Sequence, residues 1–414
     1  MRRYWWKFFL VVFPLTVLWG ISNPMFASPD EPAHMVRAQG IVRGQLEGPY
    51  KVDGIPVNDI ECLAFKPEAS ADCMSLDWAE APTYEDSTAT NYPPLFHFLA
   101  GLPSLIFQGL SGAYVMRIWM AFICSSLLAS AGAILFERYK SNFVLLGWSL
   151  SITPMVLFVS STVNPSGLAV ALGSLIWALS IVWVDSSKDI RKPWMLRLLG
   201  ISMLAFLLIR RDSLIWLLSI SASILLFMNT ITASDLRSRL GKFRWFFPFV
   251  FSGLVALAIV NWVAPSWSFL SAGNSGRNRF AAIPNDTFTY IKQAVGWFGW
   301  LDTPLSDPLM FLALFILGVF LLGGLIVSKK TDTRAIISVI GTVFLIPLVF
   351  AEFRYPYFQG RYYLPLLVGG FYLSGKSLGS TPIPDRVKIR FVALLGFAWG
   401  IVHCLSFVTN IRRY

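Results

Sequence analysis

The chain has 414 residues, of which 55% are hydrophobic and 14% are charged, and it carries a formal net charge of +11. Soluble globular domains contain about 25% charged residues, so this composition excludes that class and indicates an integral membrane protein. The positive charge does not indicate nucleic acid as a partner, because the basic clusters are short, lie between apolar stretches and match no nucleic-acid-binding motif. In membrane proteins such clusters mark cytoplasmic loops that face anionic lipid.

The chain begins with a basic stretch followed by an apolar run near 5–24. This order also fits a cleaved signal peptide, with small residues at Ala27 and Ser28. The run is at the long end for a signal peptide, and it starts with two tryptophans, which anchor helices at a membrane interface. We therefore interpret it as an uncleaved first membrane-spanning helix.

Further stretches approach the roughly 20 apolar residues that a spanning helix needs. They lie near residues 117–136, 142–161, 166–184, 195–209, 213–231, 245–263, 308–327, 335–352, 363–379 and 391–409. With the first run, they predict an all-α polytopic membrane protein of about 11 transmembrane helices. No repeat or appended soluble segment is evident, so we expect a single domain over residues 1–414.

The short apolar stretch 94–110 decides the topology. Pro103 and two glycines interrupt it, so it spans the membrane, lies along it or re-enters it. The positive-inside rule places the basic N-terminus in the cytoplasm and the stretch 22–93, with twelve acidic and four basic residues, outside. The later basic connectors then fall in the cytoplasm only if 94–110 does not span. We therefore predict a membrane-lying helix at 94–110.

This topology gives two large extracytoplasmic loops, over residues 22–116 and 264–307. It leaves Arg412 and Arg413 outside, against the positive-inside rule and without an explanation from the sequence. The unusual polar segments then share one outer face: 28–34, 164–166, 210–212 and 352–363.

Two adjacent acids, Asp30 and Glu31, follow the first helix closely and lie between prolines, which stiffen the backbone. A positioned carboxylate acts as a general base or binds a divalent cation. His34 is placed to assist. The alternative interpretation is a solvated acidic turn.

Arg210 and Arg211 occupy a tight turn between two apolar stretches, on a face where the positive-inside rule predicts few arginines. Paired guanidinium groups suit a phosphate, so a lipid phosphate is one candidate ligand. The alternative is that both side chains extend to lipid headgroups. Arg361 and Tyr362, in the run QGRYYLP, offer a second anion contact and an aromatic ring for a sugar face or for the interface.

Other polar positions on the outer face are candidates for substrate contacts. Asn91 and Tyr92 head the stretch 94–110, Asp302 lies among aromatic residues in GWLDTP, and Asn164 lies in a short outer loop. His97, in the same stretch, is more simply a structural histidine.

Four cysteines are present. Cys62 and Cys73 share the acidic outer loop, where they form a disulfide if the compartment is oxidising and are otherwise two free thiols. Cys124 and Cys404 lie in apolar spans, and we interpret them as small packing residues.

The motifs SPDEPAH, NYPPLFH, GWLDTP and QGRYYLP, in this order and spacing, resemble the predicted membrane proteins known as domain of unknown function 2142. That family looks like a member of the GT-C clan of polytopic glycosyltransferases. The resemblance covers essentially the whole chain. It implies a sugar donor carried on polyprenyl phosphate, an extracytoplasmic active site with a catalytic acid at Asp30, and membrane-lying helices in the first loop.

One position departs from the family. Its members commonly have Asn-Pro-Asp in the next outer loop, where this chain has Asn-Pro and then Ser166. The second acid is missing, which leaves open whether Asp30 binds a divalent cation such as Mg²⁺ or Mn²⁺.

We therefore predict an inverting GT-C-type glycosyltransferase of the bacterial plasma membrane, which acts on an envelope glycan, lipid or protein acceptor. Asp30, with Glu31 and His34 beside it, deprotonates the acceptor, and the arginines hold the phosphate of the polyprenyl-phosphate donor. A lipid-linked glycan flippase is an alternative, disfavoured because charged residues are scarce within the spans. A non-catalytic partner in an envelope polysaccharide complex is another.

Overall fold

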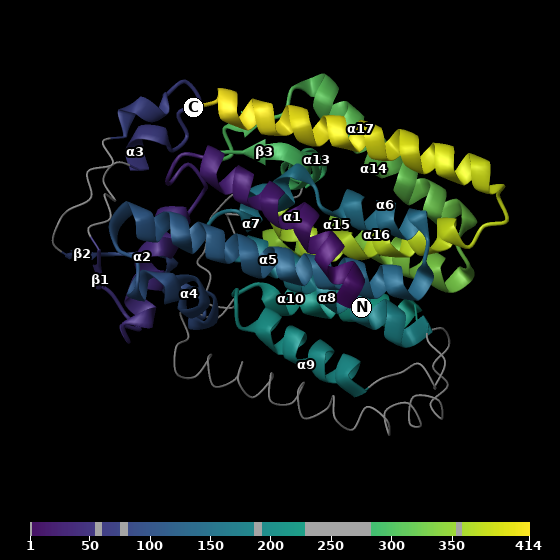
Figure 1. Cartoon of the computed structure of the whole chain (residues 1–414), viewed down its shortest axis with the longest axis horizontal. Helices are drawn as coiled ribbons and strands as arrows, with labels where there is room; N and C mark the ends of the chain where they lie inside the picture. Colours follow the sequence, from purple (N-terminus) through teal and green to yellow (C-terminus); the bar gives the residue numbers. More distant parts are fainter. Residues whose placement is uncertain (1, 54–59, 75–81, 186–192, 228–282, 353–357) are drawn as a thin grey trace.

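The structure is a computed structural model that describes residues 2–53, 60–74, 82–185, 193–227, 283–352 and 358–414. The described part is a bundle of helices with a smaller group of short elements at one end (Figure 1). The predicted span 245–263 and the first part of the second outer loop, 264–282, lie outside the described residues.

The helices of the bundle differ widely in length. They are α1 (Arg2–Ser22), α5 (Gly109–Tyr139), α6 (Asn142–Ser151), α7 (Pro154–Ser160), α8 (Pro165–Asp185), α9 (Pro193–Leu207), α10 (Ser213–Phe227), α14 (Asp307–Val327), α15 (Lys330–Glu352), α16 (Leu364–Gly379) and α17 (Asp385–Arg412). Among the described residues, five helices are long and apolar enough to cross a membrane, or six if α6 and α7 count as one bent span. The chain is thus an all-α polytopic membrane protein; α9 has 15 residues, as many as the span predicted at 195–209, and α10 is described as far as Phe227.

The predicted span 142–161 is not one continuous helix, because two helices joined at a bend occupy it. Helix α6 ends at Ser151, and α7 starts at Pro154 and turns away by 60°. Proline has no amide hydrogen with which to continue α6. Thr153 caps α7 by accepting a hydrogen bond from the Val156 amide at 3.3 Å, and its hydroxyl donates to the Ala294 carbonyl of α13 (Ile283–Gly296) at 2.9 Å.

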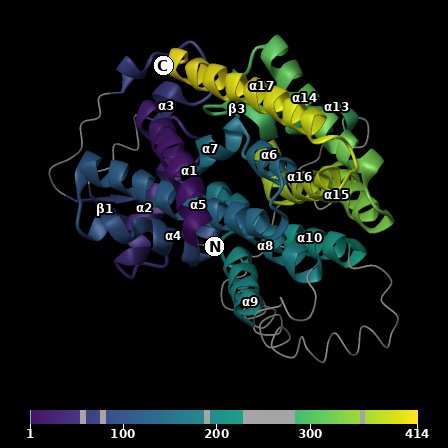
Figure 2. The same cartoon turned by 45° about the vertical axis from the view of Figure 1, so that its right-hand side comes forward.

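Helix α8 lies at the centre of the bundle, between α5 and α16 (Figures 1 and 2). Every one of its side chains from Pro165 to Val182 is buried. On one side, the indole of Trp177 donates to the Pro365 carbonyl at 3.1 Å. Pro365, in the first turn of α16, faces Gly173, which lies two turns into α8, so the segment that precedes α16 lies near the first turn of α8.

The predicted first helix is an integral part of this bundle. Helix α1 packs along α5, where Trp5 Nε1 donates to the Ser126 carbonyl at 3.2 Å and to the Ser130 hydroxyl at 3.0 Å. The Phe8 ring also meets the edge of Trp148, with 4.6 Å between ring centroids.

The contact between α16 and α8 depends on a glycine. A Cβ atom at Gly369 would overlap the Trp177 ring, whereas one at Gly400, on the exposed face of α17, would meet no atom within 4 Å. We expect Gly369→Ala to lower the free energy of unfolding by about 1–3 kcal/mol, the usual cost of overpacking. Gly400→Ala is the control and should be neutral or stabilising. Thermal unfolding in detergent measures both variants, and equal melting temperatures would contradict the packing described here.

The first outer loop contains short elements rather than a spanning helix. They are α2 (Glu31–Val42), β1 (Tyr50–Val52), α3 (Ile60–Leu63), η2 (Ala71–Cys73), β2 (Thr83–Glu85), η3 (Thr88–Asn91), α4 (Pro94–Gly101) and η4 (Leu102–Leu105). Strands β1 and β2 pair antiparallel, and α4 packs against α2. The stretch 94–110 is therefore a short helix within the loop, as predicted. Cys62 and Cys73 form a disulfide, which confirms the first of the two alternatives.

The two remaining cysteines differ from each other. Cys124 is buried in α5, as predicted for a packing residue. Cys404 is exposed on α17, so the prediction of a packing role is wrong there: α17 lies on the outside of the bundle and buries only one face.

The C-terminal residues are tied to the outer loops. Arg413 donates to the carbonyls of Lys66 and Ala69 at 2.6 Å each, and it pairs with Asp302 at 3.3 Å. Asp302 belongs to the turn between β3 (Trp297–Phe298) and β4 (Thr303–Pro304). These contacts explain an arginine at the outer end, which the positive-inside rule alone disfavours.

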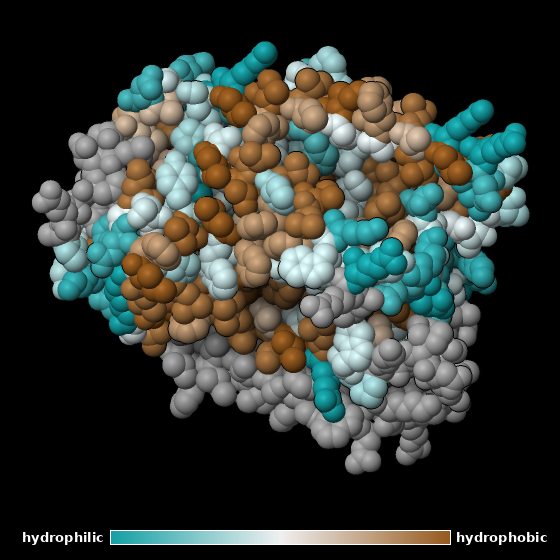
Figure 3. Space-filling view, viewed as in Figure 1, coloured by the Kyte–Doolittle hydropathy of each residue, from teal (hydrophilic) through white to brown (hydrophobic). Residues whose placement is uncertain are grey.

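The two ends of the bundle are polar and its sides are apolar, as the brown surface between teal ends shows (Figure 3). At the end away from the first outer loop, Lys376 pairs with Asp185 at 3.3 Å and with Asp332 at 3.1 Å. The first turns of α8 and α16, the turn after α9 and the start of α2 all meet at the other end. The described residues of these polar segments therefore lie at one end of the bundle, as predicted, and the extracytoplasmic side of that end stays a prediction.

Candidate active site

Asp30 lies at the outer end of the bundle, immediately before α2. Its backbone has a φ of 64°, in the left-handed region that aspartate tolerates better than most residues. A residue at this position normally accepts amide hydrogens of the first helical turn, yet the Asp30 carboxylate makes no such bond. The side chain is 44% exposed and points to groups outside its own helix. Left-handed backbone at a non-glycine residue is often found at functional sites.

The partner of Asp30 is Arg361, which lies 331 residues away in the sequence. Arg361 Nη2 donates to Asp30 Oδ2 at 2.7 Å, and its side chain is only 4% exposed. Its segment η7 (Gly360–Tyr363) sits tightly on α13: the Gly360 amide donates to Gln293 Oε1 at 2.8 Å, and Tyr290 leaves no room for a Cβ atom at Gly360.

One nitrogen of Arg361 is not used by the protein. Its Nε is buried and has no hydrogen-bond partner within the described residues. A buried donor left without a partner costs about 1–3 kcal/mol, more when it is charged. An anion bound at Arg361 would remove this cost, so the site is suited to an acidic ligand beside the Asp30 carboxylate.

Arg210 supports the same site through Tyr362. Its guanidinium lies 3.9 Å from the centroid of the Tyr362 ring, a cation–π contact. Its nitrogens are otherwise engaged by Asp212, at 2.8 and 3.2 Å, and by the Ser166 hydroxyl at 2.7 Å. These contacts favour a positioning role, and phosphate binding by Arg210 stays a prediction. Arg211 follows in the same turn and is half-buried.

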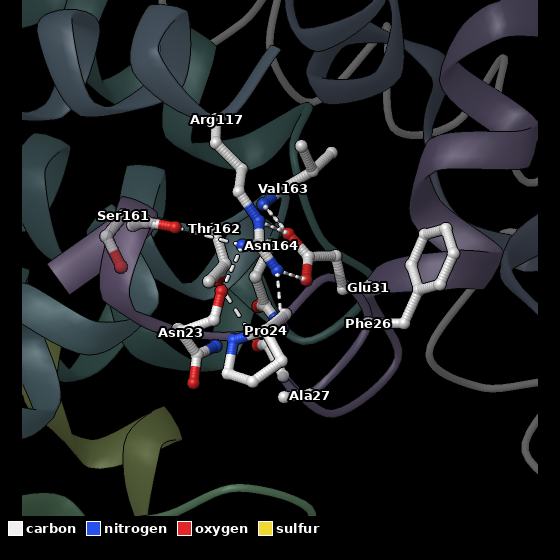
Figure 4. Close-up of polar contacts among 12 residues, drawn as sticks. Asn23, Pro24, Phe26, Ala27, Glu31, Arg117, Ser161, Thr162, Val163 and Asn164 are labelled. Atoms are coloured by element: carbon white, nitrogen blue, oxygen red, sulfur yellow. Dashed lines mark hydrogen bonds and ion pairs between the residues drawn. The ribbon is translucent and has the colours of Figure 1, made fainter. Parts of the chain in front are cut away.

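Glu31, next to Asp30, has a different environment. Its carboxylate is fully buried and accepts from Arg117 Nε at 2.8 Å and Nη2 at 2.6 Å, and from the Val163 amide at 3.1 Å (Figure 4). The other N–H groups of Arg117 donate to the carbonyls of Gly20, Asn23 and Pro24 at 2.7–2.9 Å. All five guanidinium donors are thus satisfied. A catalytic role for Glu31 stays untested, and this burial favours a structural one.

The loop before α8 also fixes the position of Asp30. Asn164 Nδ2 donates to the Pro29 carbonyl at 3.0 Å, and the hydroxyls of Ser28 and Thr162 lie 3.2 Å apart. Asn164 Oδ1 accepts from the Ser166 amide at 2.9 Å, which caps the start of α8. The structure therefore brings Asn164 to the site, where it holds the backbone next to the acid.

His34 lies one turn beyond Asp30 on α2 and is almost fully buried. Its Nδ1 lies 3.1 Å from Nε2 of His97, in α4. The pKa of His34 is lowered to about 3, mainly by burial; Asp30 opposes this shift, and the positive charges of Arg361 and Arg210 add to it. His34 is therefore neutral at physiological pH and close enough to these charges to respond to them.

Tyr92 closes this side of the site. Its ring meets the edge of the His34 ring, with 5.2 Å between centroids. Its carbonyl accepts from Arg37 Nη2 at 2.6 Å, and Arg37 Nη1 donates to the Ala89 carbonyl at 2.5 Å. Burial raises the pKa of the Tyr92 hydroxyl, as does the nearby Tyr362. Asn91, the last residue of η3, is exposed.

Asp302 is the predicted site residue that the structure does not bring to Asp30. Its carboxylate accepts from the Thr303 hydroxyl at 2.9 Å and pairs with Arg413 at 3.3 Å. Both charged partners are almost fully buried, so Asp302 serves to hold the end of the chain against the outer loop.

The side chains at the site do not fit a Mg²⁺ or Mn²⁺ ion. Among the described residues, no three His, Cys, Asp or Glu side chains gather closely enough to hold a metal. Asp30 is paired with Arg361, and Ser166, where the family commonly has an acid, accepts from Arg210. Divalent cations of this kind take oxygen ligands, several of them carboxylates. No step proposed below involves a metal ion.

Sequence reasoning missed two charged residues of this region, Arg117 and Asp212. Arg117 was the first residue of a predicted span, and an arginine at its outer end breaks the positive-inside rule in the same way as Arg210. That signal was available. Asp212 directly follows Arg210 and Arg211, and an ion pair between Arg210 and Asp212 across the turn could also have been predicted.

Comparisons with known proteins agree with this architecture. The structure is similar to the crystal structure of ArnT from Cupriavidus metallidurans in the apo state, with a TM-score of 0.53 and 15% identity over 94% of this chain and 61% of that one. It is also similar to the apo oligosaccharyltransferase from Archaeoglobus fulgidus, with a TM-score of 0.50 and 10% identity over 98% of this chain and 56% of that one. This chain therefore spans less than two thirds of either protein.

At these identities the likeness shows a shared fold, and the chain has the GT-C-like fold of these two structures. A search of the curated proteins finds no match to this chain. The family of predicted membrane proteins designated DUF2142 matches residues 13–369. Because that match covers most of the chain, the protein belongs to the DUF2142 family.

Proposed function

We propose that this protein is a membrane glycosyltransferase that moves a sugar from a polyprenyl-phosphate donor to a hydroxyl of an envelope glycan, lipid or protein. The observation that carries the proposal is the pair of Asp30 and Arg361: a half-exposed carboxylate bound to a buried arginine whose Nε lacks a partner among the described residues. The Asp30 carboxylate can accept a proton, and the Arg361 guanidinium can bind an anionic leaving group. The GT-C-like fold supports this use of the pair.

The proposed reaction is a single displacement. The acceptor oxygen attacks the anomeric carbon of the sugar while the bond from that carbon to the phosphate oxygen breaks, so the configuration inverts. The acceptor proton passes to Asp30, and the electron pair of the broken bond stays on the polyprenyl phosphate. Arg361 stabilises the negative charge that develops there, which is usually the largest contribution of such a site.

An apolar cavity beside the site supports a lipid-linked donor. It has a volume of about 180 Å³ and lies next to Leu364, the first residue of α16. Its walls come from α13, α14 and α16, and they are almost entirely hydrocarbon. A lipid chain would fill this cavity while its phosphate reached Arg361, three residues before Leu364. We place the reaction on the extracytoplasmic face of a bacterial plasma membrane, following the charge distribution of the loops.

Removing the guanidinium should weaken donor binding. We expect Arg361→Ala to raise the Kd for polyprenyl phosphate roughly 10- to 100-fold, since a hydrogen bond to a charged group contributes about 1.5–3 kcal/mol. Arg361→Lys keeps the positive charge but loses the forked arrangement of N–H donors. Its Kd for polyprenyl phosphate should therefore lie between those of the wild type and Arg361→Ala. Binding is measured in nanodiscs, together with the melting temperature of each variant.

Arg43→Ala is the matched control for this test, because Arg43 is also a paired arginine of the outer face but contacts Asp53 and Ser104 instead. Its affinity for polyprenyl phosphate should equal that of the wild type. If folded Arg361→Ala protein bound polyprenyl phosphate as tightly as the control, Arg361 would not be the phosphate ligand.

Transfer itself is tested in liposomes with polyprenyl phosphates that carry radiolabelled glucose, mannose, galactose or arabinose. The expected result is loss of label from the lipid with at least one of these donors when membrane extract supplies the acceptor. Movement of the intact labelled lipid across the bilayer, with no transfer, would instead support a flippase.

A further inference from the structure

A second cavity lies at the end of the bundle opposite Asp30, around the ion pairs of Lys376. Its volume is about 460 Å³, and its walls come from the ends of α5, α8, α10 and α16 and the starts of α6 and α15. The side chains of Arg138 and Asp185 in these walls are 31% and 32% exposed, so a ligand can enter from outside. The positive-inside rule predicts that this end faces the cytoplasm.

The two carboxylates of the cavity are engaged by the protein itself. Lys376 donates to Asp332 at 3.1 and 3.2 Å and pairs with Asp185 at 3.3 Å. The Tyr139 hydroxyl also donates to Asp185, at 3.0 Å, and Arg138 lies 4.0 Å from the same carboxylate. The charges of Lys376 and Arg138 therefore balance those of the two acids.

The cationic side of the cavity has donors to spare. Arg138 Nη2 donates to the Asp185 carbonyl at 3.0 Å, but Nε of Arg138 is buried and has no hydrogen-bond partner among the described residues. Lys329 also lines the cavity, is exposed, and forms no ion pair within the described part of the chain. A charged group with an unmatched buried donor is costly. An anion in the cavity would remove this cost and balance the charge of Lys329.

The helix ends around the cavity add to the preference for an anion. Helix α15 starts at Lys330, beside the wall formed by Thr331, and the first amides of a helix have no acceptor within it. Such a helix start attracts negative charge. The carbonyl ends of α5 and α16 are closed by protein amides, those of Lys140 and Ser380.

The apolar residues of the cavity indicate that its ligand is amphipathic. Val144, Val184 and Phe227 complete the lining, and the Phe227 ring lies 4.5 Å from the Lys376 ammonium group. A soluble phosphate would use the cationic side only. A phospholipid would place its phosphate there and its glycerol backbone against the apolar residues. Basic pockets between spanning helices on the cytoplasmic side bind anionic lipid headgroups in this way.

We propose that this cavity binds the phosphate of an anionic phospholipid from the cytoplasmic leaflet, through Nε of Arg138 and the ammonium group of Lys329. The site lies at the other end of the bundle from Asp30 and Arg361. It is therefore separate from the proposed reaction centre, and the inference does not depend on the proposed function.

The test is the affinity of the purified protein for phosphatidylglycerol, measured by native mass spectrometry from detergent. We expect Arg138→Gln to raise the Kd roughly 10- to 100-fold, since it removes hydrogen bonds from a charged donor. Lys329→Gln should raise it roughly fivefold, the usual contribution of one basic residue to anionic lipid binding. Because Lys329 is exposed, this second variant should keep the melting temperature of the wild type.

Arg386→Gln is the matched control. Arg386 is an exposed basic residue in the first turn of α17, at the same end of the bundle but outside the lining of the cavity. Its removal should leave the Kd for phosphatidylglycerol unchanged. Arg361→Ala should also leave it unchanged, whether or not that variant loses polyprenyl phosphate, so the two sites are tested separately.

Other ligands distinguish the source of the phosphate. Phosphatidylcholine, whose phosphate is balanced by its own choline, should bind more weakly than phosphatidylglycerol. If glycerol 3-phosphate or inorganic phosphate bound as tightly as phosphatidylglycerol, with the same losses in the two variants, the phosphate site would stand and its ligand would be soluble. If folded Lys329→Gln and Arg138→Gln bound phosphatidylglycerol as tightly as Arg386→Gln, the inference would be overturned.

Discussion

Asp30→Asn should lower the rate of sugar transfer by about 10²- to 10⁴-fold, the usual contribution of a general base. Asparagine has nearly the same shape and still accepts a hydrogen bond from Arg361, so the donor should bind with similar affinity. It cannot take the proton of the acceptor hydroxyl. The measurement is the transfer of radiolabel from the active donor at saturating concentration, compared with the wild type in the same liposomes.

The fold should tolerate this change. The Asp30 side chain is 44% exposed, and ion pairs with an exposed partner contribute little to stability, about 0–1 kcal/mol. The melting temperature of Asp30→Asn should therefore stay close to that of the wild type. A folded variant with full transfer activity would remove Asp30 from the reaction.

Glu31→Gln, unlike Asp30→Asn, should destabilise the fold. We expect a loss of about 3–5 kcal/mol, the cost of breaking a buried ion pair by removing one charge. Arg117 is 1% exposed and Glu31 is 0% exposed, so the guanidinium would be left without a counter-charge in the interior. The pair connects the end of α1, the loop before α2, the outer end of α5 and the segment before α8. Loss of the pair should therefore destabilise the segments that hold Asp30 in position.

The control for Glu31→Gln is Asp53→Asn, which breaks a second arginine–carboxylate pair of the outer loop. Arg43 and Asp53 are 23% and 13% exposed, and water screens their interaction. We expect a loss of about 1 kcal/mol or less there. Unfolding is followed by tryptophan fluorescence in detergent. Equal losses for the two variants would show that the Glu31–Arg117 pair does not hold the loops together.

The fold class and the gathering of the polar segments at one end of the bundle could be predicted from the sequence because they depend on composition and loop charge. The positive-inside rule alone required the stretch 94–110 not to span, and the structure has α4 there. The break before Pro154 could not be predicted from the proline alone, because α1 runs through Pro14 without a break.

The pairing of charges could not be predicted in the same way. The residues alone made Asp30 and Glu31 equivalent neighbours, and only the family resemblance singled out Asp30 as the catalytic acid. In the structure, Asp30 is half-exposed at the proposed reaction centre, whereas Glu31 is buried in the core. The difference depends on the left-handed backbone at Asp30 and on distant partners. Arg361 lies 331 residues from Asp30, and Arg117 lies 86 residues from Glu31. Local patterns carry no information on such distant contacts. For the same reason, Asp302 was predicted at the site, whereas it pairs with Arg413.

A structure of Asp30→Asn with its polyprenyl-phosphate sugar bound would show whether Asp30 and Arg361 form the reaction centre. We expect a phosphate oxygen about 3 Å from Nε of Arg361, the lipid chain in the cavity beside Leu364, and the anomeric carbon facing residue 30. A donor phosphate bound elsewhere, for example beside Lys376 at the opposite end of the bundle, would contradict this.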